Sequence, residues 1–270
     1  MRPLILMLMC MCWAPVRGEP LLNAELSWSE SAPVSAGAGL RVGQYEQALQ
    51  MPLWWRALPA GVASSHVELT QTLFTLRGNR LGERRLYRLA LPFAYYEKAY
   101  GRWHNRYHLT PALYSDERIF DLRAAQLEAG FDTSMGINSQ LNMELGARTD
   151  RRFGEHRLYY LWGLDWLDKA GWQLHAVLPE PWFGMPLQPQ WYFKAGMEPA
   201  GSRWRFGTLD HSPLSYKAVQ QYLRLQHSFS PQADLSLTLG RRLNRHLDVA
   251  GETVRPSPAP YWQLDMSAHW

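Results

Sequence analysis

Cysteine and long apolar runs are scarce in this sequence. The chain of 270 residues has two cysteines, Cys10 and Cys12, and both lie in an N-terminal segment that we expect to be removed. The mature chain would then have no disulfide and no thiolate chemistry. Beyond residue 18, no apolar run approaches the ~20 residues of a membrane-spanning helix. We therefore expect packing and backbone pairing to stabilise the mature protein.

Excess charge and the usual catalytic motifs are also scarce. The formal net charge is +4, and it falls to +2 once Arg2 and Arg17 are removed. So small a charge gives no reason to expect a nucleic-acid partner. The sequence contains no glycine-rich phosphate loop and no nucleotide motif, and it lacks the His-x-Ser motif of lipid-hydrolysing barrels. We predict no cofactor and no enzymatic activity.

Two local clusters are weak candidates for chemistry. His104 and His108 could hold a metal ion if their segment were helical, but Pro111 follows closely and no third ligand is evident. We interpret this segment as part of a loop that packs aromatic side chains over a barrel mouth. Asp210 and His211 form an acid–histidine pair, which is slight evidence for a catalytic site. We predict neither a catalytic nor a metal site.

The N-terminus has the organisation of an export signal. Arg2 is followed by an apolar run over residues 4–13, Pro15 ends that run, and small residues precede Glu19. This pattern predicts a signal peptide over residues 1–18 with cleavage before Glu19. Residues 19–270 then form the mature domain.

The C-terminus alternates between two faces and ends on an aromatic residue. A strand places successive side chains on opposite sides, so this pattern gives one apolar and one polar face. Strands of this kind close outer-membrane barrels, and we expect the apolar face to be the signal read by the barrel-assembly machinery. The apolar face consists of Trp262, Leu264, Met266, Ala268 and Trp270, and the polar face of Gln263, Asp265, Ser267 and His269.

The same alternation recurs inside the chain. Residues 135–148 read as one long strand with a nearly continuous apolar face, whose other face carries Glu144 and Arg148. A dry core would not accept these charges without partners, whereas a polar lumen would. Residues 157–167 alternate in the same way. The 13 Trp and 13 Tyr residues suit the two membrane interfaces.

These patterns predict an all-β fold, a single antiparallel transmembrane β-barrel of about 12 strands, with ten or fourteen as alternatives. The first strand lies near 22–28 or 40–45, in an otherwise irregular segment that runs to about residue 64. Prolines in 179–189 leave open whether one strand is split. The others are expected near 66–76, 85–96, 118–131, 135–148, 157–167, 172–187, 191–198, 203–209, 216–229, 233–242 and 260–270.

Loop lengths give the expected orientation. With a periplasmic C-terminus, short inner turns fall near 78–84, 131–134, 168–171, 199–202 and 230–232. The outer loops are 97–117, 149–156, 210–215 and 243–259, mostly longer, with a short exception at 188–190. Neither 44–60 nor 97–117 has a role that we can predict.

Charged residues on the polar faces are the candidates for the lumen. They are of both signs, so they could plug a narrow barrel with ion pairs or line a small pore. The lumen candidates are Glu144, Arg148, Arg157, Asp165, Lys194, Arg203 and Arg205.

The middle of the chain resembles a family of predicted Gram-negative outer-membrane β-barrel proteins of unknown function. The resemblance lies in a strand ending in Leu178-Pro179-Glu180-Pro181, a turn through Gln188-Pro189 to Trp191, a strand ending at Gly196, and Pro199 before the next strand. It implies a barrel in the outer membrane and brings no substrate and no functional residues.

Our leading hypothesis is therefore a non-enzymatic outer-membrane barrel, either a narrow pore or a structural membrane component. Its expected partners are outer-membrane lipid, the barrel-assembly machinery and small solutes. One alternative is a secreted or periplasmic β-sheet protein that binds a ligand, such as a carbohydrate, in an aromatic cleft. The other is an outer-membrane hydrolase.

Overall fold

The computed structural model describes residues 23–35, 41–77, 82–97, 102–116, 124–205, 213–249 and 252–269. Strands dominate these residues, and none of their helical turns is long and apolar enough to cross a bilayer. The strands are β1 (Asn23–Ser35), β2 (Arg41–Leu58), β3 (Gly61–Arg77), β4 (Gly82–Ala90), β5 (Phe93–Glu97), β6 (Trp103–Asp116), β7 (Ala125–Gly136), β8 (Leu141–Asp150), β9 (Arg157–Leu167), β10 (Gln173–Leu178), β11 (Trp182–Gln188), β12 (Trp191–Trp204), β13 (Leu214–Ser230), β14 (Ala233–Val249), β15 (Glu252–Val254) and β16 (Ala259–His269).

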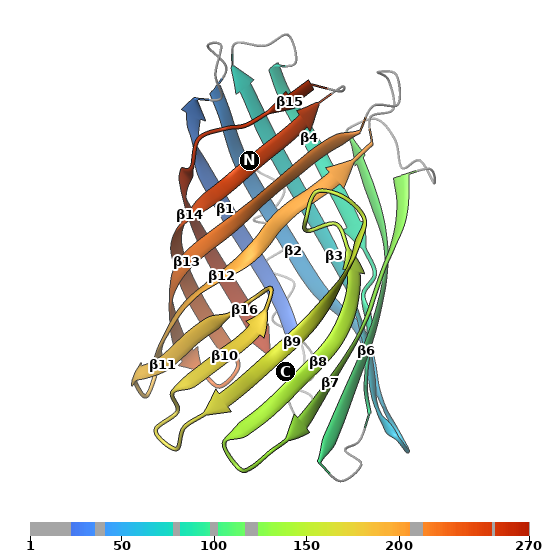
Figure 1. The fold of residues 1–270 in the computed structure, drawn as a ribbon, viewed down its shortest axis with the longest axis vertical. Helices are drawn as coiled ribbons and strands as arrows, with labels where there is room; N and C mark the ends of the chain where they lie inside the picture. Colours follow the sequence, from blue (N-terminus) through green and yellow to red (C-terminus); the bar gives the residue numbers. More distant parts are fainter. Residues whose placement is uncertain are drawn as a thin grey trace.

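These strands form one antiparallel sheet that closes into a ring (Figure 1). β4 and β5 follow one another at a single position between β3 and β6. β15 pairs only with β14 and stands off the ring. Closure comes from the last strand, since β16 pairs with β1 on one side and β14 on the other. The ring therefore has fourteen strands, and it confirms the all-β antiparallel barrel with one of the expected counts.

The outside of the ring is apolar. On β9, Leu158, Tyr160 and Trp162 expose 60%, 70% and 60% of their surface, while their neighbours Tyr159 and Leu161 are buried on the inner side. Such an exposed apolar band would be unfavourable in water and is what a lipid-facing strand presents. The Tyr160 and Trp162 rings lie on the exterior of the ring and not on its inner face.

The two ends of the barrel differ. One end, which we call the short-turn end, holds the start of β1, the end of β16 and the turns 59–60, 137–140, 168–172, 189–190 and 231–232. The opposite end, the long-loop end, holds the last residues of β1, β3, β6, β12 and β14 and the segments 151–156 and 179–181, and it lies at the top in Figure 1.

Exposed aromatic residues gather on the outside near the short-turn end. Trp54 lies at the end of β2, and Trp103 begins β6. Trp191 stacks on His227 with ring centroids 4.4 Å apart. Amphipathic rings favour the headgroup region of a bilayer, so this belt marks an expected membrane interface.

Between β8 and β12 the barrel wall extends less far toward the long-loop end than elsewhere. β10 and β11 are short, and β11 pairs with β12 only as far as Gly196 (Figure 1). Above that point the 151–156 segment packs against β12 and β13, where the Ser215 hydroxyl donates to the Gly154 carbonyl. Gly154 has φ = +79°, which a side chain would strain.

The two strands beyond the expected twelve come mostly from regions predicted to be irregular. β2 and the start of β3 occupy the segment expected to be irregular to residue 64, and β6 occupies most of the expected loop 97–117. In β2, the alternation of polar and apolar residues is broken twice. Polar Gln47 lies on the outward face, and a bulge between Pro52 and Trp54 shifts the register. In β6, Pro111 has no N–H to donate to a ladder, which makes it an unusual residue inside a strand. The region expected at 172–187 is split into β10 and β11.

The single strand predicted over 135–148 is wrong. The chain turns at 137–140, between β7 and β8. The Asn138 side chain accepts hydrogen bonds from the backbone N–H groups of Gln140 and Leu141, which stabilises this turn. A four-residue turn preserves the two-residue alternation, so the pattern ran through it without a break.

The predicted turn at 199–202 is also wrong, because β12 continues through Gly196 and Pro199 to Trp204. Pro199 is tolerated because β12 has no β11 neighbour at that level, which makes it an edge there. The resemblance to a strand ending at Gly196 fails for the same reason. Two expected orientations are reversed. The end of β3 and the start of β4, which flank the turn expected on the inner side, lie at the long-loop end, and the turn 189–190 lies at the short-turn end. The segment 131–134 lies within β7.

Candidate functional site

The lumen of the barrel contains a cavity of about 740 Å³ lined mainly by polar side chains. Six arginines and five carboxylates lie among the lining residues, so the two signs of charge nearly balance. Every second residue of the surrounding strands faces inward, which explains how strands far apart in sequence supply these groups. The charged lining residues are Glu46, Glu68, Arg88, Arg106, Glu128, Arg148, Asp150, Arg151, Arg152, Glu198 and Arg242.

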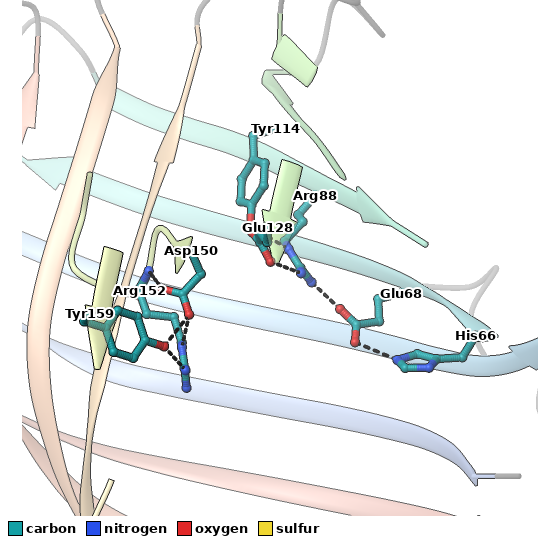
Figure 2. A network of polar contacts seen from close by, with 8 residues as sticks. All are labelled: His66, Glu68, Arg88, Tyr114, Glu128, Asp150, Arg152 and Tyr159. Carbon is teal, nitrogen blue, oxygen red and sulfur yellow. Dashed lines mark hydrogen bonds and ion pairs between the residues drawn. The ribbon is translucent and has the colours of Figure 1, made fainter. Parts of the chain in front are cut away.

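One polar network runs from strand to strand along the inner face of the barrel, from β3 to β7 (Figure 2). The Arg88 guanidinium ion-pairs with Glu68, lies 3.3 Å from a Glu128 oxygen and donates to the Tyr114 hydroxyl at 2.7 Å. The Tyr114 hydroxyl in turn donates to Glu128. His66 contacts the other Glu68 oxygen at 2.9 Å. Both carboxylates are thus held by one arginine.

A second network joins β6, β7 and β8. Asp132 accepts hydrogen bonds from Arg106 at 2.8 and 2.5 Å and from Arg148 at 3.1 and 2.9 Å. The Asp132 carboxylate is almost fully buried, and two arginines compensate its charge. Ion pairs of this kind narrow the lumen and fix its lining.

A third network lies beside the short strands β10 and β11, at the ends of β8 and β10. Arg152 ion-pairs with Asp150 at 2.9 Å, and the Tyr159 hydroxyl donates to Asp150 at 2.6 Å (Figure 2). Arg152 also ion-pairs with Glu180. Burial acts to lower the pKa of Arg152, but the Glu180 and Asp150 charges outweigh it and hold that pKa above its usual value. This arginine stays charged and ties the 151–156 segment to the ends of β8 and β10.

Apolar side chains close the lumen at the long-loop end. Trp204 of β12 packs against Phe74 of β3 at 5.8 Å between ring centroids and against Tyr114 of β6 at 6.5 Å. Phe74 also packs against Tyr216 of β13 at 5.4 Å. We call this group the apolar closure. Its buried members are Val42, Phe74, Leu76, Leu86, Ala90, Ala112, Tyr114, Trp204, Leu214, Tyr216, Ala218 and Leu247.

Arg148 is the one lumen candidate that lines the main cavity. Glu144, on the same inward face of β8, lies opposite Gly163. Asp165 pairs with His175 at 3.2 Å.

The remaining lumen candidates lie elsewhere. The Lys194 ammonium lies 4.0 Å from the centre of the Trp182 ring, and the Arg157 guanidinium 5.7 Å from that of Phe153. Arg203 and Arg205 line a second cavity, which shares Arg151 with the main one. They were assigned to a strand at 203–209, whereas β12 ends at Trp204.

Several lining residues were missed, among them Glu68, Arg88, Glu128 and Trp204. Glu68 and Arg88 fall in the strands expected near 66–76 and 85–96, but no pattern paired them across strands.

No group of three or more metal-binding side chains occurs in the part of the chain that the structure describes. His104 and His108 lie on β6 and not on a loop, which corrects that prediction. Asp210 and His211 lie outside the described residues.

No protein-family model matches the sequence, and no characterised protein sequence matches it. Among solved structures, the chain is similar to an outer-membrane channel from Pseudomonas putida F1, with 11% identity, a TM-score of 0.55 and coverage of 96% of this chain and 97% of that one. It is also similar, at lower scores, to the Pseudomonas putida toluene transporter TodX (8% identity, TM-score 0.46, 95% and 90% covered) and the NanC porin (12%, 0.42, 92% and 98%). The fold is thus that of an outer-membrane β-barrel, and the resemblance seen in the sequence holds at this level.

Proposed function

We propose that this protein is a non-enzymatic outer-membrane channel of a Gram-negative bacterium, with a narrow lumen for small polar solutes. The observation that carries the proposal is the polar cavity of about 740 Å³ inside a closed ring with an apolar exterior. The long-loop end would face outward and the short-turn end the periplasm, since barrels of this class have long loops outside. The apolar closure would then be the outer gate.

The lining charges suggest the class of solute. Six arginines and five carboxylates line the cavity. Arg88 and Arg152 pair with lining carboxylates, and Arg106 and Arg148 pair with Asp132. A lumen without a dominant charge favours neither anions nor cations strongly. We therefore expect weak ion selectivity and passage of small neutral or zwitterionic polar molecules.

Planar-bilayer recording of the purified full-length protein tests the proposal. We expect small, discrete conductance steps, well below those of an open sixteen-stranded porin, because ion pairs and the apolar closure fill much of the lumen. Folded protein that inserts into the bilayer and never conducts would contradict the channel and leave a structural role.

Assembly depends on the last strand in this proposal. Leu264 and Met266 lie on the outward face of β16, in pairing register with Leu237 and Leu235 of β14. Trp270 lies outside the described residues, and its role as part of the signal for the barrel-assembly machinery is a proposal. Deleting Trp270 should lower the amount of folded protein in the outer membrane, measured by heat-modifiable gel mobility of membrane fractions. Unchanged abundance and folding would refute this role.

A further inference from the structure

Three arginines that have no carboxylate partner among the described residues gather at the long-loop end. Arg151 follows β8, Arg203 lies near the end of β12, and Arg205 follows that strand directly. Together with Pro213 they line a second cavity of about 270 Å³, which shares Arg151 with the main cavity. No carboxylate lines it among the described residues, which sets this cavity apart from the balanced main lumen.

The fold holds these residues together despite their like charge. The end of β12 leans toward β6, where Arg205 forms a parallel bridge with Ser115 and its N–H lies 3.4 Å from the Tyr114 carbonyl. The Gln126 side chain donates to the Arg203 carbonyl at 3.2 Å. These contacts hold the backbone at Arg203 and Arg205 against β6 and β7, and the side chains of both residues line the same cavity as Arg151.

The local electrostatics show that positive charge is in excess there. Burial, and then the charge of Arg203, hold the pKa of Arg151 below its usual value, and Arg205 adds to the effect. Glu128 acts in the opposite direction, but Tyr114 and Arg88 already bind its oxygens. The Nε of Arg151 is buried and has no hydrogen-bond partner.

Three partly buried arginines of the lumen are ion-paired, whereas the more deeply buried Arg242 and Arg245 contact the Tyr261 ring and the oxygens of Tyr216 and Ser257. Arg88, Arg148 and Arg152 each contact a carboxylate. A cluster of three guanidinium groups that departs from this arrangement costs stability unless an anion neutralises it.

We propose that Arg151, Arg203 and Arg205 form a binding site for a phosphate group. A guanidinium presents a planar fork of N–H donors that matches two oxygens of a phosphate. A phosphate monoester carries about −1.5 to −2 charges at neutral pH, which suits three clustered cations better than a single carboxylate does. The group can come from a phosphorylated lipid of the surrounding leaflet or from a soluble phosphate compound at the barrel mouth.

Ligand titrations of the full-length protein in zwitterionic detergent test the site. Inorganic phosphate, a short-chain phosphatidic acid and a short-chain phosphatidylcholine would be titrated separately by isothermal calorimetry. We expect wild-type protein to bind at least one phosphate-monoester probe and to ignore the phosphatidylcholine. Arg203→Gln should weaken that binding about tenfold or more, because it removes a charge-assisted bidentate contact.

Matched variants make the result decisive. Arg255→Gln removes one positive charge from an exposed residue outside both cavities, in the connection between β15 and β16, and should leave binding unchanged. If Arg203→Gln does not fold, Arg205→Gln replaces it, since that side chain is exposed and contributes little packing. Binding of phosphatidic acid alone identifies a lipid ligand, and binding of inorganic phosphate identifies a soluble one. Absence of binding by either probe, or equal loss in Arg255→Gln, would overturn the proposal.

Discussion

Replacing Trp204 with alanine should raise the single-channel conductance several-fold. The Trp204 side chain is 4% exposed and reaches from β12 to Phe74 and Tyr114 on the opposite wall. Its removal leaves a space the size of an indole ring in the apolar closure. Because the neighbouring strands remain hydrogen-bonded, the barrel should fold and the space should open toward solvent. Planar-bilayer recording gives the conductance.

The matched control for this variant is Trp162→Ala. Trp162 has the same side chain but lies on the lipid-facing side of β9, 60% exposed. We expect its conductance to equal that of the wild type. A folded Trp204→Ala protein, shown by heat-modifiable mobility, whose conductance matches both would mean that the apolar closure does not limit passage.

Replacing Arg88 with methionine should destabilise the barrel by roughly 3 kcal/mol. Breaking a buried ion pair by removing one partner costs about 3–5 kcal/mol, and the lower end applies because the lumen cavity can admit water. Arg88 binds both Glu68 and Glu128, so its loss leaves two carboxylates uncompensated. Urea unfolding in detergent micelles, followed by tryptophan fluorescence, measures the change.

Two further variants separate charge from packing in this network. The triple variant Arg88→Met, Glu68→Gln, Glu128→Gln should recover most of the lost stability, since it removes the unpaired charges. Arg157→Met, which removes a guanidinium lying 5.7 Å from the Phe153 ring centre, should cost less than about 1 kcal/mol. A loss in Arg88→Met that the triple variant does not recover would show that Arg88 acts through packing and not through charge.

Strand faces were predicted well because alternation reports them directly. Glu144 and Arg148 lie on the inner side of β8, and Leu141, Met143 and Leu145 alternate with them on the outer side. β9 and β16 likewise have the faces that their sequences indicate. By contrast, the turn at 137–140 was invisible because it keeps the alternation in phase, and β6 was hidden by Pro111.

The sequence by itself determined the barrel class and which side of most strands meets lipid, because an extended chain has a fixed two-residue period. Only the tertiary structure decided that fourteen strands close the ring, that Arg88 meets Glu68 and Glu128, and that Trp204 meets Phe74. Those contacts join segments far apart in the chain, and their partners depend on register and ring closure, which no local pattern encodes. The cluster of Arg151, Arg203 and Arg205 arises in the same way, from the lean of β12 toward β6.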